Sequence, residues 1–439
     1  MSQEKTAHIS LEEEIEKINA CVHCGYCLPA CPTYLSTGNE GNSPRGRLYL
    51  IKDLIRGAKE ELEDTAQTYL DNCLGCMACE TACPSGVEYT DLLEYARYDR
   101  GQSKYHKGLW GFVRKQAFKY ILPNRFLLNM MRISLRGMNF IYKLLPFLPK
   151  LVKIQPKLEF EYKKIETDSF YPALENLDAI DNPESTVILN LGCVMDTIYN
   201  QVHIDTIKVL NAIGYHVYVP STNCCGALAS HSGEHDVGEK QKQAFLKKQK
   251  TTIDGITINK VVFNSAGCGA FIKESKNLDP DLKLLDIAEL LDIDNWQAPL
   301  PLASFKQKLE VVNYRLLKFF DETDVSDEIS IDITYHPACH LSHAQGIRGV
   351  YEKILALMKK VNLKTLYEAE VCCGSAGFYN LIKPDMADDI GKRKAENIQN
   401  SNAKYVMTAN PGCMSQIEAY LPENYRVIHP MTLLAAVLT

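Results

Sequence analysis

Two runs of cysteines with identical spacing constrain this chain more than any other feature of its sequence. Each run reads C-x2-C-x2-C-x3-C-P; the first starts at Cys21 and the second at Cys73. Three thiolates on one short turning loop can reach three corners of an iron–sulfur cubane, whereas the fourth, offset by proline, points toward a neighbouring cluster. The spacing therefore predicts two [4Fe–4S] clusters that exchange their fourth ligand.

The predicted ligand sets are crossed. The first cluster takes Cys21, Cys24, Cys27 and Cys83. The second cluster takes Cys31, Cys73, Cys76 and Cys79. Zinc is the alternative, but zinc sites use two C-x2-C pairs and need neither a third step nor the C-P. Since four thiolates complete each site, we expect His23 to pack beside the first cluster rather than to bind it.

The stretch between the two runs predicts helices. Residues 47–70, RLYLIKDLIRGAKEELEDTAQTYL, are rich in helix formers. Ser10 and Glu13 form a capping-box signature, which predicts a further helix before Cys21. We therefore expect residues 1–99 to form an α-helical ferredoxin domain rather than the small β-containing kind.

The other eight cysteines form two groups that resemble each other. The first group is Cys193, Cys224, Cys225 and Cys268, and the second is Cys339, Cys372, Cys373 and Cys413. The runs TVILNLGC, KVVFNSAGC, DITYHPAC and KYVMTANPGC each read as a strand that ends at a cysteine. Ligands bind at the carboxyl ends of strands in α/β sheets. We predict two repeated α/β domains, 184–293 and 328–439, and thus an α+β multidomain fold.

Each group contains a Cys-Cys-Gly step. Glycine permits a tight turn that aims two sulfurs into one cavity. Buried packing of small apolar side chains is the alternative, but repetition at similar intervals favours a metal or redox site. His336, His340 and His343 surround Cys339, and His231 and His235 follow the first CCG. Lone histidines of this kind are more often hydrogen-bonded than metal-bound, although three around one cysteine suggest proton handling.

The pattern resembles the CCG domain, C-xn-CCG-xn-C-x2-C, found in heterodisulfide reductase and in many respiratory iron–sulfur proteins. In the reductase, each domain supplies five cysteines to a non-cubane cluster. The fifth position here is Phe271 in one repeat and Gln416 in the other. Four cysteines per repeat suit one [4Fe–4S] cluster or one zinc ion, and we expect metal in at least one repeat.

Residues 100–165 form a separate segment. Between 100 and 158 there are thirteen Lys or Arg, no Asp or Glu, and many interleaved apolar residues. Pro123, Pro146 and Pro149 predict two or three amphipathic helices. Such helices suit an anionic lipid surface, a docking face for an acidic flavoprotein, or a solvated spacer.

Composition narrows the class of protein further. The net charge of −6 argues against a nucleic-acid binder. The charged N-terminus has no apolar h-region, and no run of about 18 apolar residues predicts a transmembrane helix. Sixteen cysteines without an export signal indicate a reducing compartment, so we expect a cytoplasmic metalloprotein. Motifs for nicotinamide, nucleoside triphosphate and c-type haem are absent.

Nearly the whole chain resembles the iron–sulfur subunits of glycolate oxidase. The resemblance rests on VHCGYCLPACPTYLSTGNEGNSPRGRLYLIK, CLGCMACETACPSGVEY, CCGALASHSGE, NSAGCGAFIKE, YHPACHLSHAQGIR, CCGSAGFYNLIKPDMADDIGKRKAENI and TANPGCMSQI. It implies that FAD-containing partner subunits oxidise glycolate to glyoxylate. Electrons would then pass through this chain to a quinone-type acceptor in the membrane, with the chain peripheral on the cytoplasmic face of the inner membrane.

Three other functions stay open from the sequence. Close relatives of the same kind serve lactate or glycerol-3-phosphate dehydrogenases. A heterodisulfide or thiol reductase would place catalysis at the CCG sites themselves, although the missing fifth cysteines speak against it. A sensing module would use clusters only to shape a surface. In the first of these cases, as for glycolate, we expect no substrate oxidation by the isolated chain.

Overall fold

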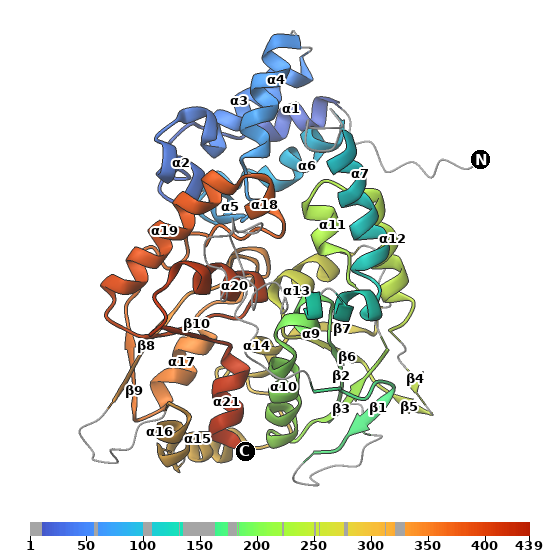
Figure 1. The fold of residues 1–439 in the computed structure, drawn as a ribbon, viewed down its shortest axis with the longest axis vertical. Helices are drawn as coiled ribbons and strands as arrows, with labels where there is room; N and C mark the ends of the chain where they lie inside the picture. Colours follow the sequence, from blue (N-terminus) through green and yellow to red (C-terminus); the bar gives the residue numbers. More distant parts are fainter. Residues whose placement is uncertain are drawn as a thin grey trace.

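The computed structural model shows a helical N-terminal domain lying across the ends of two α/β lobes (Figure 1). It describes residues 11–56, 60–99, 108–130, 132–134, 163–173, 182, 184–221, 224–249, 252–253, 255–275, 280–311, 313–320 and 330–439. Within these ranges, none of the helices combines the length and the apolar character that crossing a membrane requires.

The N-terminal domain is helical, as the sequence predicts. Its helices are α1 (Leu11–Asn19), α2 (Pro32–Thr37), η1 (Glu40–Asn42), α3 (Pro44–Ile55), α4 (Glu60–Asp71), α5 (Ala78–Thr81) and α6 (Tyr89–Asp99). No strand occurs among the described residues between 11 and 99. Ile51, Leu70, Leu92 and Leu93 are at most 1% exposed and form the centre of its core. The prediction of a helical rather than a β-containing domain is confirmed.

The first α/β repeat is a parallel sheet in the strand order β3-β2-β6-β7. Its strands are β2 (Thr186–Asn190), β3 (His216–Val219), β6 (Lys260–Phe263) and β7 (Lys283–Asp286). Its helices are α9 (Val194–Ile198), α10 (Asn200–Ala212), α11 (Ala227–His231), α12 (His235–Leu246), α13 (Ala266–Lys273) and α14 (Ile287–Leu290). Every residue of β2, β3 and β6 is buried, as expected where helices cover both faces.

Two small additions complete this repeat. Strand β1 (Ser169–Tyr171) pairs antiparallel with β3, so the sheet begins before residue 184. A short hairpin of β4 (Thr252–Ile253) and β5 (Ile256–Thr257) stands apart from the main sheet.

The second repeat is a parallel sheet in the order β9-β8-β10-β11. Its strands are β8 (Ile331–Tyr335), β9 (Val361–Lys364), β10 (Tyr405–Met407) and β11 (Arg426–Ile428). Its helices are η3 (His340–Ala344), α17 (Val350–Leu357), α18 (Tyr379–Ile382), α19 (Pro384–Asn400), α20 (Pro411–Tyr420) and α21 (Pro430–Leu438). In both repeats the order is second, first, third, fourth strand, so the internal repetition seen in the sequence extends to the topology.

The two repeats share one hydrophobic core. Helix α21 at the end of the second repeat packs on α10 of the first, and α14 of the first packs on α17 of the second (Figure 1). The connecting helices α15 (Leu302–Val311) and α16 (Asn313–Phe319) pack against α21. Val187 from β2, Ile333 from β8 and Leu434 from α21 belong to the same cluster of buried residues. The repeats therefore form a single rigid base for the cysteine sites.

Part of the basic segment packs over the first repeat. It contains α7 (Gly108–Gln116), the π-helical turn η2 (Ala117–Ile121), and a helix that starts at residue 125, just after Pro123. Pro123 thus ends one helix, as predicted. Pro146 and Pro149 lie outside the described residues.

Candidate metal centres

The first N-terminal pocket is lined by the four sulfurs of the predicted first cluster. Cys83 comes from the second run and faces Cys21, Cys24 and Cys27 of the first. Gly25 has φ +85°, which lets the loop turn tightly around the pocket. Cys24 is exposed, whereas the other three cysteines are half-buried. The first pocket therefore lies at the surface of the molecule.

His23 beside this pocket is held by neighbouring side chains. Its Nδ1 lies 3.6 Å from Cys21 Sγ, and its ring stacks on Tyr49 with centroids 4.7 Å apart. Arg45 Nη1 donates to the His23 carbonyl at 3.1 Å. These contacts agree with packing beside the cysteines.

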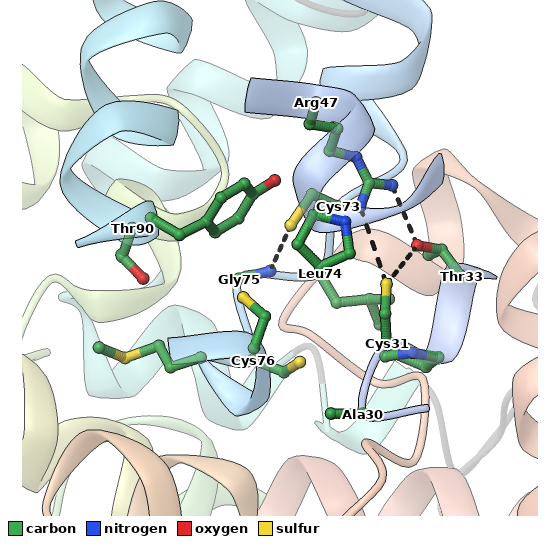
Figure 2. Close-up of a pocket in the computed structure, with 14 residues that line it drawn as sticks. Ala30, Cys31, Thr33, Arg47, Cys73, Leu74, Gly75, Cys76 and Thr90 are labelled. Carbon is green, nitrogen blue, oxygen red and sulfur yellow. Dashed lines mark hydrogen bonds between the residues drawn. The ribbon is translucent and has the colours of Figure 1, made fainter. Parts of the chain in front are cut away.

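The second N-terminal pocket is deeper. Figure 2 shows Cys31 from the first run facing Cys73 and Cys76 from the second, and Cys79 completes the lining. The Gly75 N–H donates to Cys73 Sγ at 3.4 Å. Backbone N–H groups aimed at sulfur stabilise the reduced form of an iron–sulfur cluster. The structure thus brings together the two crossed cysteine sets, and their assignment as ligands stays a prediction.

A buried arginine compensates the charge of the second pocket. Arg47 is 1% exposed; its Nη1 donates to Cys31 Sγ at 3.9 Å and its Nη2 to Thr33 Oγ1 at 3.0 Å (Figure 2). Burial alone would raise the pKa of the Cys73 thiol, but Arg47 and Arg97 outweigh burial and hold that pKa below its usual value. A thiolate is therefore favoured at Cys73. Arg47 could not be predicted as a site residue, because nothing in PRGRLYL separates an inward-facing arginine from a surface one.

The second pocket adjoins the second repeat. Cys76 hydrogen-bonds to Cys372, and this contact together with burial raises its pKa well above the usual value. The Tyr379 hydroxyl donates to the Asn72 carbonyl at 2.8 Å, and His343 Nδ1 lies 3.0 Å from Thr81 Oγ1. The second N-terminal site and the second CCG site are therefore direct neighbours.

The first CCG site collects four sulfurs from three strand ends. Cys193 Sγ lies 3.3 Å from Cys224 Sγ, and Cys225 Sγ lies 3.2 Å from Cys268 Sγ. Gly226 has φ +94°, and a Cβ there would stand 2.3 Å from the Gly238 carbonyl oxygen, so only glycine fits this turn. The hydrogen bond with Cys193 and burial raise the pKa of Cys224 well above its usual value. Such thiols ionise when a metal ion replaces the proton.

The second CCG site repeats this arrangement and adds a histidine. Cys339 hydrogen-bonds to Cys372, and Cys373 to Cys413. One nitrogen of His336 and the sulfurs of Cys373 and Cys413 lie within 4.8 Å of one another, and all three residues are buried. These are donor atoms that zinc or iron accepts.

A second buried cation lies beside this site. Lys394 is 2% exposed, and its Nζ donates to the carbonyls of Glu368 at 2.5 Å and Ala369 at 3.3 Å. Burial lowers its pKa to about 8, although Cys373 and Cys372 act in the opposite direction. Lys394 was also missed from the sequence, where it lies among other charged residues of one amphipathic helix.

The remaining histidines have separate surroundings. His340 Nδ1 lies 3.4 Å from Cys339 Sγ, and its ring contacts that of His231 at an interplanar angle of 57°, with centroids 5.1 Å apart. Burial lowers the pKa of His231 to about 3 and that of His340 to about 4, so both rings are neutral near pH 7. His235 instead contacts Ser230, 3.2 Å from its Nδ1.

One asparagine links the two CCG sites. Asn410 Nδ2 donates to Cys413 Sγ at 3.6 Å, and its Oδ1 accepts from the Gly267 N–H at 3.4 Å. Gly267 directly precedes Cys268. The two CCG sites therefore face each other across a single side chain.

The fifth cysteine position of the CCG pattern is occupied by Phe271 in the first repeat and by Gln416 in the second. Phe271 is buried under the ammonium group of Lys242, 4.6 Å from the ring centroid. The Gln416 amide donates to the Ala387 carbonyl at 3.2 Å and accepts from Asn380 at 3.3 Å. Both side chains are used in packing or hydrogen bonding.

Comparisons with known proteins agree with this geometry. A 4Fe-4S dicluster domain matches residues 17–87, and a cysteine-rich CCG domain matches residues 187–273 and 333–418. The probable glycolate oxidase iron–sulfur subunit of Bacillus subtilis is 33% identical over 420 residues, which cover 92% of this chain and 89% of that relative. The chain belongs to the family of glycolate oxidase iron–sulfur subunits.

More distant relatives span the same length. The glycolate oxidase iron–sulfur subunit of Escherichia coli is 29% identical over 402 residues, covering 91% of this chain and 89% of the relative. A component of the dihydromethanophenazine:CoB–CoM heterodisulfide reductase of Methanosarcina barkeri is 23% identical over 423 residues, covering 91% and 88%. The chain is an iron–sulfur electron-transfer subunit of an oxidoreductase, and its helical domain holds two [4Fe–4S] clusters.

The crossed ligand sets can be tested with one substitution per pocket. Cys83→Ser should remove the first cluster and Cys31→Ser the second, since each pocket loses one of its four sulfurs. Each variant should lose about four iron atoms per chain relative to the unmodified protein, measured after anaerobic purification. If Cys83→Ser instead removes the cluster bound by Cys73, Cys76 and Cys79 and leaves the other cluster in place, the crossing is wrong.

Removal of the buried cation should change one reduction potential. Arg47→Gln should lower the potential of the second cluster by roughly 60–130 mV, because a hydrogen bond to a charged group contributes about 1.5–3 kcal/mol and ~59 mV is tenfold for one electron. Arg47→Lys keeps the charge and should shift the potential less. An EPR-monitored titration in which Arg47→Gln leaves both potentials unchanged would contradict the role given to Arg47.

Proposed function

We propose that this chain carries electrons from an FAD-containing partner that oxidises glycolate toward a quinone-type acceptor in the membrane. The observation that carries the proposal is the continuous series of four cysteine sites in the folded chain. The relatives named as glycolate oxidase subunits support the substrate. The eight N-terminal cysteines are proposed as ligands of the two clusters, and the eight CCG cysteines as ligands of further metal sites.

The order of the sites follows from their contacts. The first pocket shares the Cys21–Cys31 run with the second, Cys76 of the second pocket contacts Cys372, and Asn410 joins the two CCG sites. Bound iron–sulfur clusters supply one-electron carriers, which suits a flavin donor that releases two electrons singly. The residues of the chain keep these carriers close together.

The exposed end of the series is suited to a protein partner. Around the first pocket, Val22 and Tyr26 are each 67% exposed and Tyr49 is 53% exposed. Aromatic side chains of this kind are enriched at protein interfaces. We place the FAD-containing subunit at this face, within reach of the exposed Cys24.

The opposite end lies beneath the basic segment. Phe118, Leu122 and Leu128 of this segment are at most 5% exposed and form a cluster with Cys193 and Cys224 of the first CCG site. Arg114 pairs with Glu234 at 3.0 Å and Arg125 with Asp196 at 2.8 Å. One face of the segment is therefore fixed over the first CCG site.

The outer face of the same segment is apolar. Its exposed large apolar residues are Phe112, Val113, Tyr120, Phe126, Leu127, Met130 and Ile133. An apolar face interleaved with basic residues suits insertion into an anionic lipid surface. We propose that this face rests on the cytoplasmic side of the inner membrane, which brings the first CCG site close to a lipid-borne quinone.

The proposed order of the sites corresponds to a division of the chain into four parts. We propose a ferredoxin domain at 1–99, the basic segment at 100–165, and CCG domains at 184–293 and 328–439, with β1 added to the first CCG sheet.

A lactate-linked function is the nearest alternative, because lactate utilization protein A of Oceanobacillus iheyensis is 26% identical over 236 residues. That match covers 53% of this chain.

Purification of the intact complex tests the partner and the substrate. Isolated anaerobically from the native host through a tag on this chain, the complex should contain FAD, and glycolate should reduce its iron–sulfur EPR signals. The chain alone should contain no flavin and should not respond to glycolate. Reduction by lactate or glycerol-3-phosphate but not by glycolate would contradict the substrate, and a complex without flavin would contradict the partner.

Flotation with liposomes tests the membrane face. Replacing Phe112, Phe126 and Ile133 together by Ser should reduce flotation with anionic vesicles at low salt at least tenfold, because burial of each such side chain contributes about 1.5–3 kcal/mol. Tyr367→Ser, at a residue 69% exposed on the second repeat, is the control and should float like the unmodified chain. Equal flotation of the triple variant, or none for the unmodified chain, would contradict the lipid contact.

A further inference from the structure

The protonation of one buried histidine is determined by its hydrogen bond. His336 follows β8, is 1% exposed, and has Nδ1 3.0 Å from the Ala369 carbonyl oxygen. A carbonyl oxygen accepts and cannot donate, so Nδ1 carries the proton of the neutral ring. The lone pair of the ring is therefore on Nε2.

This Nε2 has no hydrogen-bond partner among the residues that the structure describes, although it is buried. One His336 nitrogen and the sulfurs of Cys373 and Cys413 lie within 4.8 Å of one another. Because Nδ1 is engaged by Ala369, Nε2 is the nitrogen available to a metal ion held by those sulfurs. Leaving a buried polar atom without a partner costs about 1–3 kcal/mol, which metal binding would recover.

Among the described residues of the first repeat, the corresponding position holds no histidine. The position three residues before its first cysteine is Asn190, which corresponds to His336 before Cys339. The Asn190 amide exchanges hydrogen bonds with Gln249, at 2.9 Å from Gln249 Nε2 to Asn190 Oδ1 and 3.5 Å in the other direction. The histidine therefore distinguishes two sites whose cysteines are otherwise alike.

The carbonyl that orients His336 is itself fixed. Ala369 O also accepts from Lys394 Nζ at 3.3 Å, and Lys394 is buried. Metal-binding histidines commonly donate their second ring N–H to a backbone carbonyl, which fixes the tautomer and the ring orientation. The surroundings of His336 match that arrangement.

We propose that His336 Nε2 is a metal ligand of the second CCG site, which then offers four thiolates and one imidazole, whereas the first offers thiolates alone. A neutral imidazole adds a fifth donor without a fifth negative charge. Compared with the five thiolates of the full CCG pattern, one imidazole in place of one thiolate should raise the potential of an iron–sulfur centre, as in Rieske centres. This role of His336 rests on the proposal that the CCG cysteines hold metal, and it does not depend on which substrate the partner oxidises.

Spectroscopy of the full chain tests the ligand directly. The chain is purified anaerobically with natural or ¹⁵N-labelled histidine, and pulsed EPR measures nitrogen coupling to its paramagnetic centres. If the metal site gives no EPR signal, X-ray absorption at the iron and zinc edges detects its nitrogen ligand instead. The unmodified chain should show an imidazole nitrogen in a first coordination shell, with a coupling that changes on ¹⁵N labelling.

Three variants distinguish a metal-ligating role of His336 from a purely structural one. His336→Gln should lose the nitrogen signal, and His340→Gln, whose Nδ1 is also near a cysteine sulfur, should keep it. His336→Cys restores a donor and should keep the metal content while losing the nitrogen signal. Loss of the second CCG metal in His336→Gln, with the metal retained in the other two variants, also supports the proposal. It is overturned if the unmodified chain has no metal in the second CCG site, if that site shows no nitrogen, or if the nitrogen persists in His336→Gln.

Discussion

The exchange of Cys31 and Cys83 between the two N-terminal pockets is the constraint on which the rest of the structure depends. Each pocket is lined by cysteines of both runs, so the helices between the runs fold back and bring the pockets together. That folding also presents Cys76 on the surface that meets Cys372. Docking of the helical domain on the second repeat, and the series of four sites, follow from this exchange.

Burial of many sulfurs in one interior requires compensation of negative charge. Arg47 beside the second pocket and Lys394 beside the second CCG site are each at most 2% exposed. A buried cation without an anionic partner would be strongly destabilising, and so would a buried thiolate without a cation, a hydrogen bond or a metal. The buried cations and the buried cysteines therefore compensate each other's charge.

The helices and strands of the chain could be predicted from local sequence patterns. The strands before Cys193, Cys268, Cys339 and Cys413 were predicted from β-rich runs and are present, as is the all-helical domain around the first two motifs. The spacing of the cysteines also predicted which sulfurs would share each N-terminal pocket. These features are determined by residues that are close together in the sequence, so the sequence alone is enough to predict them.

Long-range contacts were not predictable from the same patterns. The packing of distant elements determines that Arg47 and Lys394 point inward. It also leaves Nε2 of His336 without a hydrogen-bond partner among the residues that the structure describes. The sequence also does not tell which residues of the basic segment are buried and which are exposed. Phe118 is 1% exposed and Phe126 is 71% exposed, although both are phenylalanines in the same segment.

An EPR-monitored reductive titration of the full chain tests the central claim most directly. The account predicts two [4Fe–4S] signals whose lines broaden or split when both clusters are reduced, because a shared set of crossed ligands places them side by side. A chain with no redox-active cluster in its N-terminal domain, or with two clusters whose spectra simply add, would contradict it.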